Sequence, residues 1–166
     1  IFIASPASTH KQYIIKSLLN NKNVFVEKPL CLTTKELSEI KKLSSNNLLL
    51  MVGYNRRFSP LINKLKNIID EFKSAKCFIY NCNAGYLDPS HWTQDIEKGG
   101  GILLGEACHF VDLLRFLSGS PITHISKIEI ENKNIISDSF SISIKFEDGS
   151  IGTINYFSNG HRSFPK

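Results

Sequence analysis

The chain has 166 residues, 42% of them hydrophobic, which is enough to build one compact domain or two incomplete ones. Its net charge of +5 comes from scattered lysines and arginines, a pattern typical of a solvated surface and also compatible with a phosphorylated ligand. No apolar run approaches the ~20 residues that span a bilayer, and the first residues lack the features of a signal peptide. The composition therefore predicts a soluble globular protein without a membrane segment, and the charge alone is a weak argument for nucleic-acid binding.

The first fifty residues alternate between strand and helix patterns. Short apolar runs at 1–4, 24–27 and 48–53 have the length and composition of buried strands. Helical patterns at 9–21 and 33–45 separate these runs, and the second opens with a threonine that can cap a helix. We therefore expect a β-α-β-α-β unit whose parallel sheet is covered on both faces.

The pattern changes after Arg57. An amphipathic helix is expected over 59–72, beginning at Ser59 and Pro60, and an alternating strand follows at 76–84. A second helix is expected over 102–119, after a polar loop without clear periodicity. This helix carries an apolar stripe made of Leu103, Ala107, Phe110, Leu114 and Leu117.

Three alternating runs close the chain, at 124–131, 139–147 and 150–158, and Asp148-Gly149 between the last two is a hairpin signal. We expect a mainly antiparallel open sheet that packs on the second helix. The predicted class is α/β: a partial parallel sheet over 1–57, followed by a partial α+β domain over 58–166. The chain starts inside a strand and stops just after one, which favours a fragment of a longer protein.

Polar residues follow the expected parallel strands at their carboxyl ends, where open α/β sheets bind ligands. Ser5-Pro6 follows the first strand, Glu27-Lys28-Pro29 the second and Tyr54-Asn55-Arg56-Arg57 the third. Pro29 would fix the turn that aims Glu27 and Lys28 to opposite sides. The alternative is an ordinary surface Glu-Lys pair before a loop.

Glu106 and His109 lie one helical turn apart on the flank of the apolar stripe. A histidine there can exchange a proton near neutral pH, and a carboxylate beside it can orient it. The glycine run 99–101 just before the helix allows a close approach to the backbone. The alternative is a structural histidine at the edge of a core.

Together these segments resemble the GFO/IDH/MocA oxidoreductases, the family of glucose-fructose oxidoreductase and inositol dehydrogenase. The resemblance rests on four motifs in family order: SPASTH at 5–10, EKP at 27–29, NRRFSP at 55–60 and GGGILLGEACHFVDLL at 99–114. Residues 83–110 further resemble the branch that forms the second half of bi-domain oxidoreductases, behind a zinc-type alcohol-dehydrogenase-like half linked to surface-polysaccharide synthesis.

The resemblance implies an NAD(P)-dependent dehydrogenase that acts on a sugar, sugar nucleotide or polyol. Residues 1–57 would be the carboxyl-terminal part of a Rossmann domain, and residues 58–166 a substrate and oligomerisation domain whose open sheet joins copies of the chain. Lys28 and His109 would be catalytic, with Glu106 standing where the family usually has aspartate. The implied cofactor-binding residues are Ser5, Pro6, His10, Glu27, Lys28, Pro29, Asn55 and Arg56, and the implied substrate-binding residues are Trp92, Glu106 and His109.

The family's GxGxxG phosphate motif is not present, because the glycines at 99–101 and 105 follow a polar loop rather than a strand. This chain alone is therefore expected to be inactive, with NAD or NADP as the cofactor of the parent protein. The four cysteines form no CxxC pair and the histidines lie far apart, so we expect free thiols, a cytoplasmic location and no metal site. The alternative function is a non-enzymatic interaction module that reuses the fold.

Overall fold

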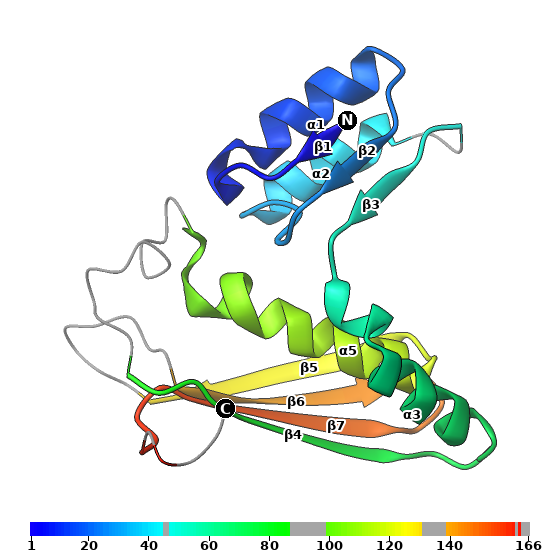
Figure 1. The fold of residues 1–166 in the computed structure, drawn as a ribbon, viewed down its shortest axis with the longest axis vertical. Helices are drawn as coiled ribbons and strands as arrows, with labels where there is room; N and C mark the ends of the chain where they lie inside the picture. The colour runs from blue at the N-terminus through cyan, green and yellow to red at the C-terminus, as the bar shows by residue number, and fades with distance from the viewer. Residues whose placement is uncertain (45–46, 87–98, 131–138, 162, 164–166) are drawn as a thin grey trace. The chain divides into compact units, whose positions relative to one another are not determined.

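The computed structural model describes residues 1–44, 47–86, 99–130, 139–161 and 163 (Figure 1). The described residues form two compact units. Those of Ile1–Tyr54 and Ser90–Cys108 make up the first unit, and those of Asn55–Pro89 and His109–Lys166 make up the second.

The first unit is built on a three-stranded parallel sheet of order β1-β2-β3. The segments between its strands are helical, as the alternating pattern predicts. The elements are β1 (Phe2–Ile3), the 3-10 turn η1 (Ala7–Thr9), α1 (His10–Leu19), β2 (Val24–Val26), α2 (Thr34–Leu43) and β3 (Leu50–Val52). Thr33 caps α2, because its hydroxyl oxygen accepts a hydrogen bond from the Glu36 backbone N–H at 3.2 Å.

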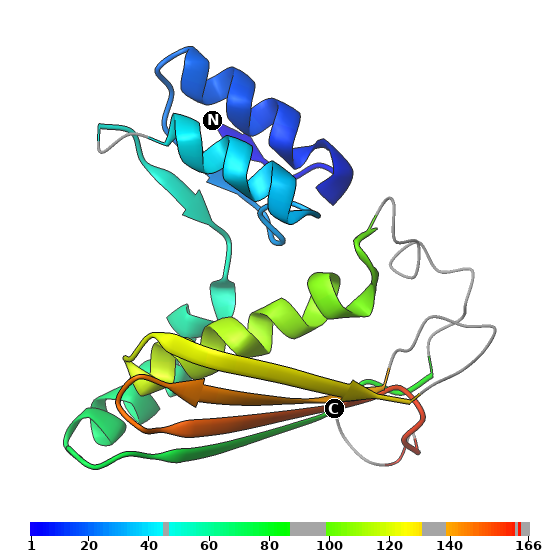
Figure 2. The same cartoon turned by 180° about the vertical axis from the view of Figure 1, so that it is seen from behind.

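Both helices of this unit lie on one face of the sheet, which Figure 2 shows from the helix side. Their buried side chains pack on the inward residues of the strands in a single cluster formed by Ile3, Ile14, Leu18, Val24, Val26 and Ile40. On the second face Phe2 is 86% exposed, so the expected cover on both faces is not found among the described residues. The reason is topological: two right-handed crossovers that step in the same direction along a sheet put both helices on the same side.

The second unit contains a four-stranded sheet of order β4-β7-β6-β5, which is antiparallel except for the parallel pair β4 and β7. Its strands are β4 (Cys77–Asn83), β5 (Ile122–Glu129), β6 (Phe140–Phe146) and β7 (Ile151–Phe157). The expected Asp148-Gly149 hairpin joins β6 to β7. Gly149 has φ 86°, a left-handed conformation that favours glycine. The mainly antiparallel sheet is therefore confirmed.

Helix α5 (Cys108–Ser118) packs on one face of this sheet (Figure 1). Phe110 is completely buried, and its ring stacks on Tyr80 of β4 with 4.5 Å between the ring centroids. A further helix, α3 (Pro60–Asp70), begins after Ser59 as predicted. The prediction of an apolar stripe that starts at Leu103 is wrong, because Leu103 is 38% exposed and belongs to a π-helical turn, η4 (Leu103–Ala107). A π-turn bonds residues five apart, so it rotates side chains away from the positions that α-helical spacing predicts.

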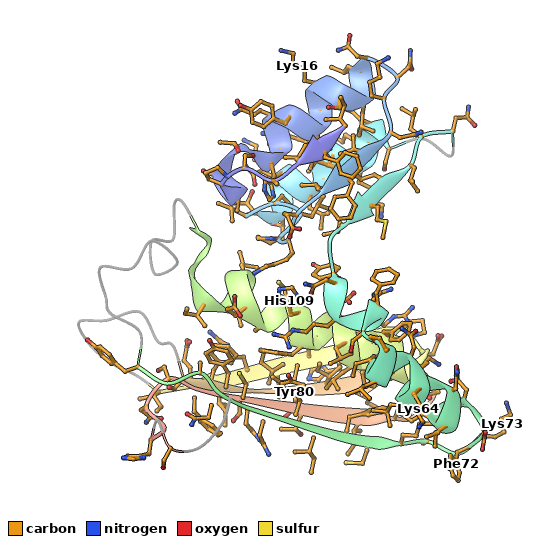
Figure 3. All side chains as sticks on the ribbon, viewed as in Figure 1. Lys16, Lys64, Phe72, Lys73, Tyr80 and His109 are labelled. Carbon is orange, nitrogen blue, oxygen red and sulfur yellow. The ribbon has the colours of Figure 1, made fainter. Side chains whose placement is uncertain are left out.

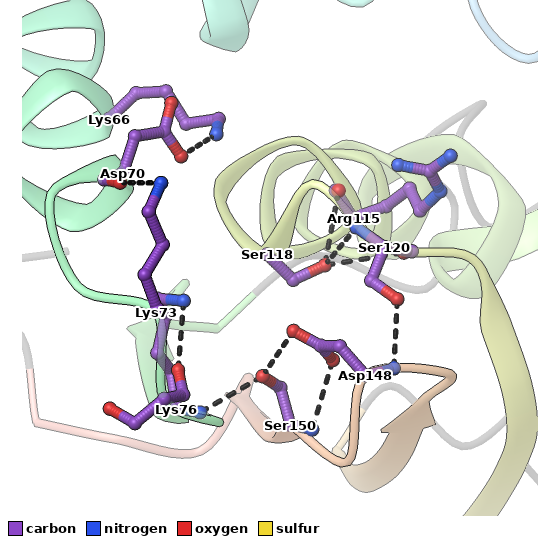
Figure 4. Close-up of polar contacts among 10 residues, drawn as sticks. Lys66, Asp70, Lys73, Lys76, Arg115, Ser118, Ser120, Asp148 and Ser150 are labelled. Carbon is purple, nitrogen blue, oxygen red and sulfur yellow. Dashed lines mark hydrogen bonds and ion pairs between the residues drawn. The ribbon is translucent and has the colours of Figure 1, made fainter.

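A polar network ties the β6–β7 turn to its surroundings (Figure 4). The Asp148 carboxylate accepts hydrogen bonds from the Ser150 backbone N–H at 3.0 Å and from the Ser150 hydroxyl at 2.9 Å. The Asp148 N–H donates to the hydroxyl of Ser120, which follows α5, and the N–H of Lys76, just before β4, donates to the Ser150 hydroxyl. The two bonds that the carboxylate accepts from Ser150, chiefly the one from the backbone N–H, hold the pKa of Asp148 below its ordinary value.

Candidate functional site

The end of strand β2 separates two opposite charges. Glu27 is exposed, and its backbone N–H continues the ladder by donating to the Ile3 carbonyl at 2.9 Å. Lys28 is largely covered, with 21% of its side chain exposed, and Pro29 is buried. The Lys28 ammonium donates to the Gly105 carbonyl and lies 3.4 Å from the Glu106 carboxylate. Within this unit Lys28 thus binds specific partners on another segment of the chain, unlike the lysine of an ordinary surface Glu-Lys pair.

The partners of Lys28 lie in the π-turn η4, Leu103–Ala107. Single π-helical turns often occur at functional sites. The glycine run before this turn serves a packing role: Gly100 has φ 77°, and a Cβ there would come within 2.8 Å of the Leu32 side chain. The close approach expected at 99–101 is therefore made by Leu32, from the segment that follows Pro29.

The loop after strand β1 is fixed by its own side chains. The Thr9 hydroxyl donates to the Pro6 carbonyl at 2.7 Å and lies 2.6 Å from the Ser5 hydroxyl. His10, the first residue of α1, is only 1% exposed. Its ring nitrogens lie 2.8 Å from the Pro29 carbonyl oxygen and 2.9 Å from the Ser5 carbonyl oxygen. The structure therefore places His10 between the two strand-end loops, with both nitrogens directed at backbone oxygens.

Two expected site residues lie in the 3-10 turn η2 (Asn55–Phe58) of the second unit. Asn55 is exposed, while the guanidinium of Arg56 lies 4.7 Å from the centre of the Phe110 ring, a cation–π geometry. The next residue, Arg57, binds Asp112 of α5 through two hydrogen bonds, of which Nε to Oδ2 is 3.0 Å. This pair was not predicted from the sequence, although an Asp one turn after His109 and a second Arg beside Arg56 are both visible there.

His109 lies in the first turn of α5 and is 8% exposed (Figure 3). Tyr80, labelled in the same view, stacks on the neighbouring Phe110. Burial raises the pKa of the Tyr80 phenol, and the positive charge of Arg56 partly opposes this effect. Tyr80 was not among the expected site residues, because a strand tyrosine at an alternating position looks like an ordinary core residue. Trp92, expected to bind substrate, lies outside the described residues.

No three His, Cys, Asp or Glu side chains come close enough to hold a metal ion in the part of the chain that the structure describes. The absence of a metal stays a prediction. The cysteines Cys31, Cys77, Cys82 and Cys108 are free thiols, and burial raises the pKa of Cys31. Among the same described residues, every helix is too short or too polar to cross a bilayer.

Two family models match the chain. Residues 1–54 match the oxidoreductase family with an NAD-binding Rossmann fold, and residues 62–164 match the GFO/IDH/MocA C-terminal domain. The scyllo-inositol 2-dehydrogenase (NAD(+)) of Bacillus subtilis is 33% identical over 129 residues, which are 76% of this chain and 37% of that enzyme. The myo-inositol 2-dehydrogenase of Thermotoga maritima is 25% identical over 163 residues, which are 93% of this chain and 48% of that enzyme.

Solved structures show the same architecture. The crystal structure of an NAD-binding protein from Listeria innocua superposes with a TM-score of 0.80 at 26% identity, covering 96% of this chain and 48% of that one. This chain spans about half or less of the length of its curated relatives. With its two parts matching the two family models in order, the chain belongs to the GFO/IDH/MocA oxidoreductase family.

Proposed function

We propose that the complete protein containing this chain is an NAD(P)-dependent dehydrogenase that moves a hydride between a nicotinamide cofactor and a polyol, sugar or sugar nucleotide. The observation that carries the proposal is the fixed ammonium of Lys28 at the carboxyl end of β2, bonded to the Gly105 carbonyl and close to Glu106. Family membership and the inositol dehydrogenases among the relatives support the reaction class and the polyol substrates.

The residues at the strand ends of the first unit fit the nicotinamide side of such a site. Dinucleotides bind beyond the carboxyl ends of parallel strands, and here Ser5 and Glu27 follow β1 and β2 with exposed or partly exposed side chains. We propose that the first unit, together with Asn55 and Arg56 of η2, supplies this half of the cofactor site, and that the rest of the second unit serves substrate binding and oligomerisation. The residues proposed to serve the cofactor are Ser5, Pro6, Glu27, Lys28, Pro29, Asn55 and Arg56.

Oxidation of an alcohol removes a hydride from carbon and a proton from oxygen. A bound nicotinamide would supply the acceptor for that hydride. Lys28 would stabilise the negative charge that develops on the substrate oxygen as the O–H bond breaks. His109 would take that proton as the general base and return it in the reverse reaction. Glu106 would hold Lys28 and a neighbouring substrate hydroxyl, and Trp92 stays a predicted substrate contact.

The test uses the complete protein with NAD and NADP and a panel of myo-inositol, scyllo-inositol, aldoses and sugar nucleotides. Turnover is followed by nicotinamide absorbance. Lys28→Met and His109→Ala should each lower kcat by about 10²-fold or more, because each removes a group that acts in the transition state. Lys41→Met, at an exposed position on α2, is the matched control and should keep normal turnover. Near-normal turnover in either site variant would remove that residue from the mechanism.

The outer face of the second sheet favours an additional role in assembly. Ile79, Ile128 and Phe157 are 71%, 75% and 41% exposed on that face, where a second copy of the sheet could cover them. We propose that copies of the protein associate through this face. Light scattering should show an oligomer that dissociates in the double variant Ile79→Asp and Ile128→Asp, and a monomeric parent would contradict this. Assembly without any turnover across the panel would favour the non-enzymatic module.

A further inference from the structure

His10 has an arrangement that the proposed mechanism does not use. Its ring is buried, and each ring nitrogen faces a backbone carbonyl oxygen, Ser5 on one side and Pro29 on the other. The two acceptors belong to different loops, one after β1 and one after β2. The ring therefore bridges the two strand ends of the first unit, with 1% of its surface exposed.

One end of this bridge is the carbonyl of Pro29, the residue that follows Lys28. Pro29 has no N–H, so its carbonyl is the one backbone group through which this residue can be tied by a hydrogen bond. The His10 Nδ1 atom lies 2.8 Å from that oxygen. Beyond the turn, the Leu32 N–H donates to the Glu36 carboxylate at 2.9 Å. The backbone that carries Lys28 is thus held from β2 on one side and from α1 and α2 on the other.

We propose that His10 is a positioning residue that aims Lys28, by joining the loop after β1 to the Lys28-Pro29 turn. The proposal rests on the function proposed above for its catalytic consequence. It assigns His10 a role different from cofactor contact. An imidazole carries two nitrogens at separate positions of one rigid ring, so a single side chain can face both carbonyl oxygens and donate its N–H to one of them.

The first test measures how accessible the Lys28 ammonium is to a reagent, and it needs no turnover. The complete protein is treated briefly with an N-hydroxysuccinimide acetate, and the acetylation of each lysine is measured by mass spectrometry. In His10→Leu, loss of the bridge should release the Lys28 ammonium from Gly105 and Glu106 and raise its acetylation several-fold. Acetylation of the exposed Lys41 should not change. The control is His161→Leu, at an exposed position. Unchanged Lys28 acetylation in His10→Leu would overturn the proposal.

The second test measures the catalytic consequence in the same variants. His10→Leu should lower kcat by about tenfold or more while KM for the cofactor stays within about twofold, since a small misplacement of a catalytic group acts on the chemical step. His10→Gln keeps an N–H donor and should recover part of the loss. In a Lys28→Met background, His10→Leu should have no further effect on kcat, because both changes act through one group. Additive losses would overturn the proposal.

Together, the two tests distinguish the positioning role of His10 from the proposed dehydrogenase function. If the parent protein turns over no substrate of the panel while Lys28 acetylation still rises in His10→Leu, the proposed function is refuted and the positioning role of His10 stands. Should His10→Leu fail to fold by circular dichroism, His10→Gln carries both measurements, with an intermediate rise in Lys28 acetylation expected and no rise contradicting the proposal.

Discussion

Replacement of Phe110 by alanine should strongly destabilise the second unit. The Phe110 side chain is completely buried, stacks on Tyr80 with 4.5 Å between centroids, lies 6.1 Å from the Tyr156 ring and carries the Arg56 guanidinium on its face. Truncation of a buried phenylalanine costs about 3–5 kcal/mol. Because stacking and cation–π contacts each add about 0.5–1.5 kcal/mol to plain burial, we expect the upper end, about 5 kcal/mol. Folded domains are typically stable by about 5–15 kcal/mol, so this loss equals the whole free energy of unfolding of a domain at the lower end of that range.

The assay is urea unfolding followed by circular dichroism, with hydrogen exchange of β4 and β7 peptides to identify the unit that opens. Phe72→Ala is the matched control: Phe72 is 60% exposed, so the same truncation should change stability by only about 0.5 kcal/mol. Phe110→Leu should cost less than Phe110→Ala, since it leaves a smaller cavity. Equal effects of Phe110→Ala and Phe72→Ala would refute the packing of α5 on the sheet as the main source of stability in this unit.

Two further predictions concern the same sheet. The folded pKa of Asp148 lies below its ordinary value of 3.8, so the stability that its carboxylate contributes should be present above pH 3.8 and be lost as the pH falls through the lower, folded value. The stability difference between Asp148→Asn and the parent should accordingly shrink under acid in urea titrations, and a difference that grows there would contradict this. A Cβ on Gly152 would come within 2.9 Å of the Leu114 side chain, so Gly152→Ala should cost about 1–3 kcal/mol in the same titrations. Thr153→Val, on the other face of β7, is its control, and equal midpoints for the two variants would count against the close packing at Gly152.

Local sequence signals were sufficient for most of the elements. Apolar runs bounded by helical patterns placed β1, β2 and β3, and Thr33 and Ser59 marked the starts of two helices. Asp148-Gly149 marked the hairpin. These features depend on residues a few positions apart, whose capping, turn formation and periodicity are encoded in the residues themselves.

Three features were not predicted from the sequence, and two of them join residues far apart in the chain. The π-turn at Leu103–Ala107 has no signal in an apolar pattern read at α-helical spacing. The Lys28 partner is the backbone carbonyl of Gly105, and any residue carries such a carbonyl. The Arg57–Asp112 pair joins positions 55 apart in the chain, so only the folded unit brings them together.

The candidate site was predicted as a set of residue types at strand ends, while its internal geometry was not. Lys28 followed by a proline at the end of a parallel strand was visible in the sequence. That His10 would bridge Ser5 and Pro29 was not, because a histidine beside a strand-end loop can equally face a ligand or the backbone. Burial decides between these two, and burial is a property of the fold.

We propose that the complete protein transfers a hydride from a hydroxyl-bearing carbon to a nicotinamide cofactor with the help of Lys28. The most direct measurement follows deuterium from a polyol labelled at those carbons into the cofactor, by mass spectrometry of the nucleotide after reaction. We predict one deuterium on each reduced nicotinamide, formed about 10²-fold more slowly by Lys28→Met. Reduced cofactor without deuterium, or equal rates in the parent and Lys28→Met, would contradict the account.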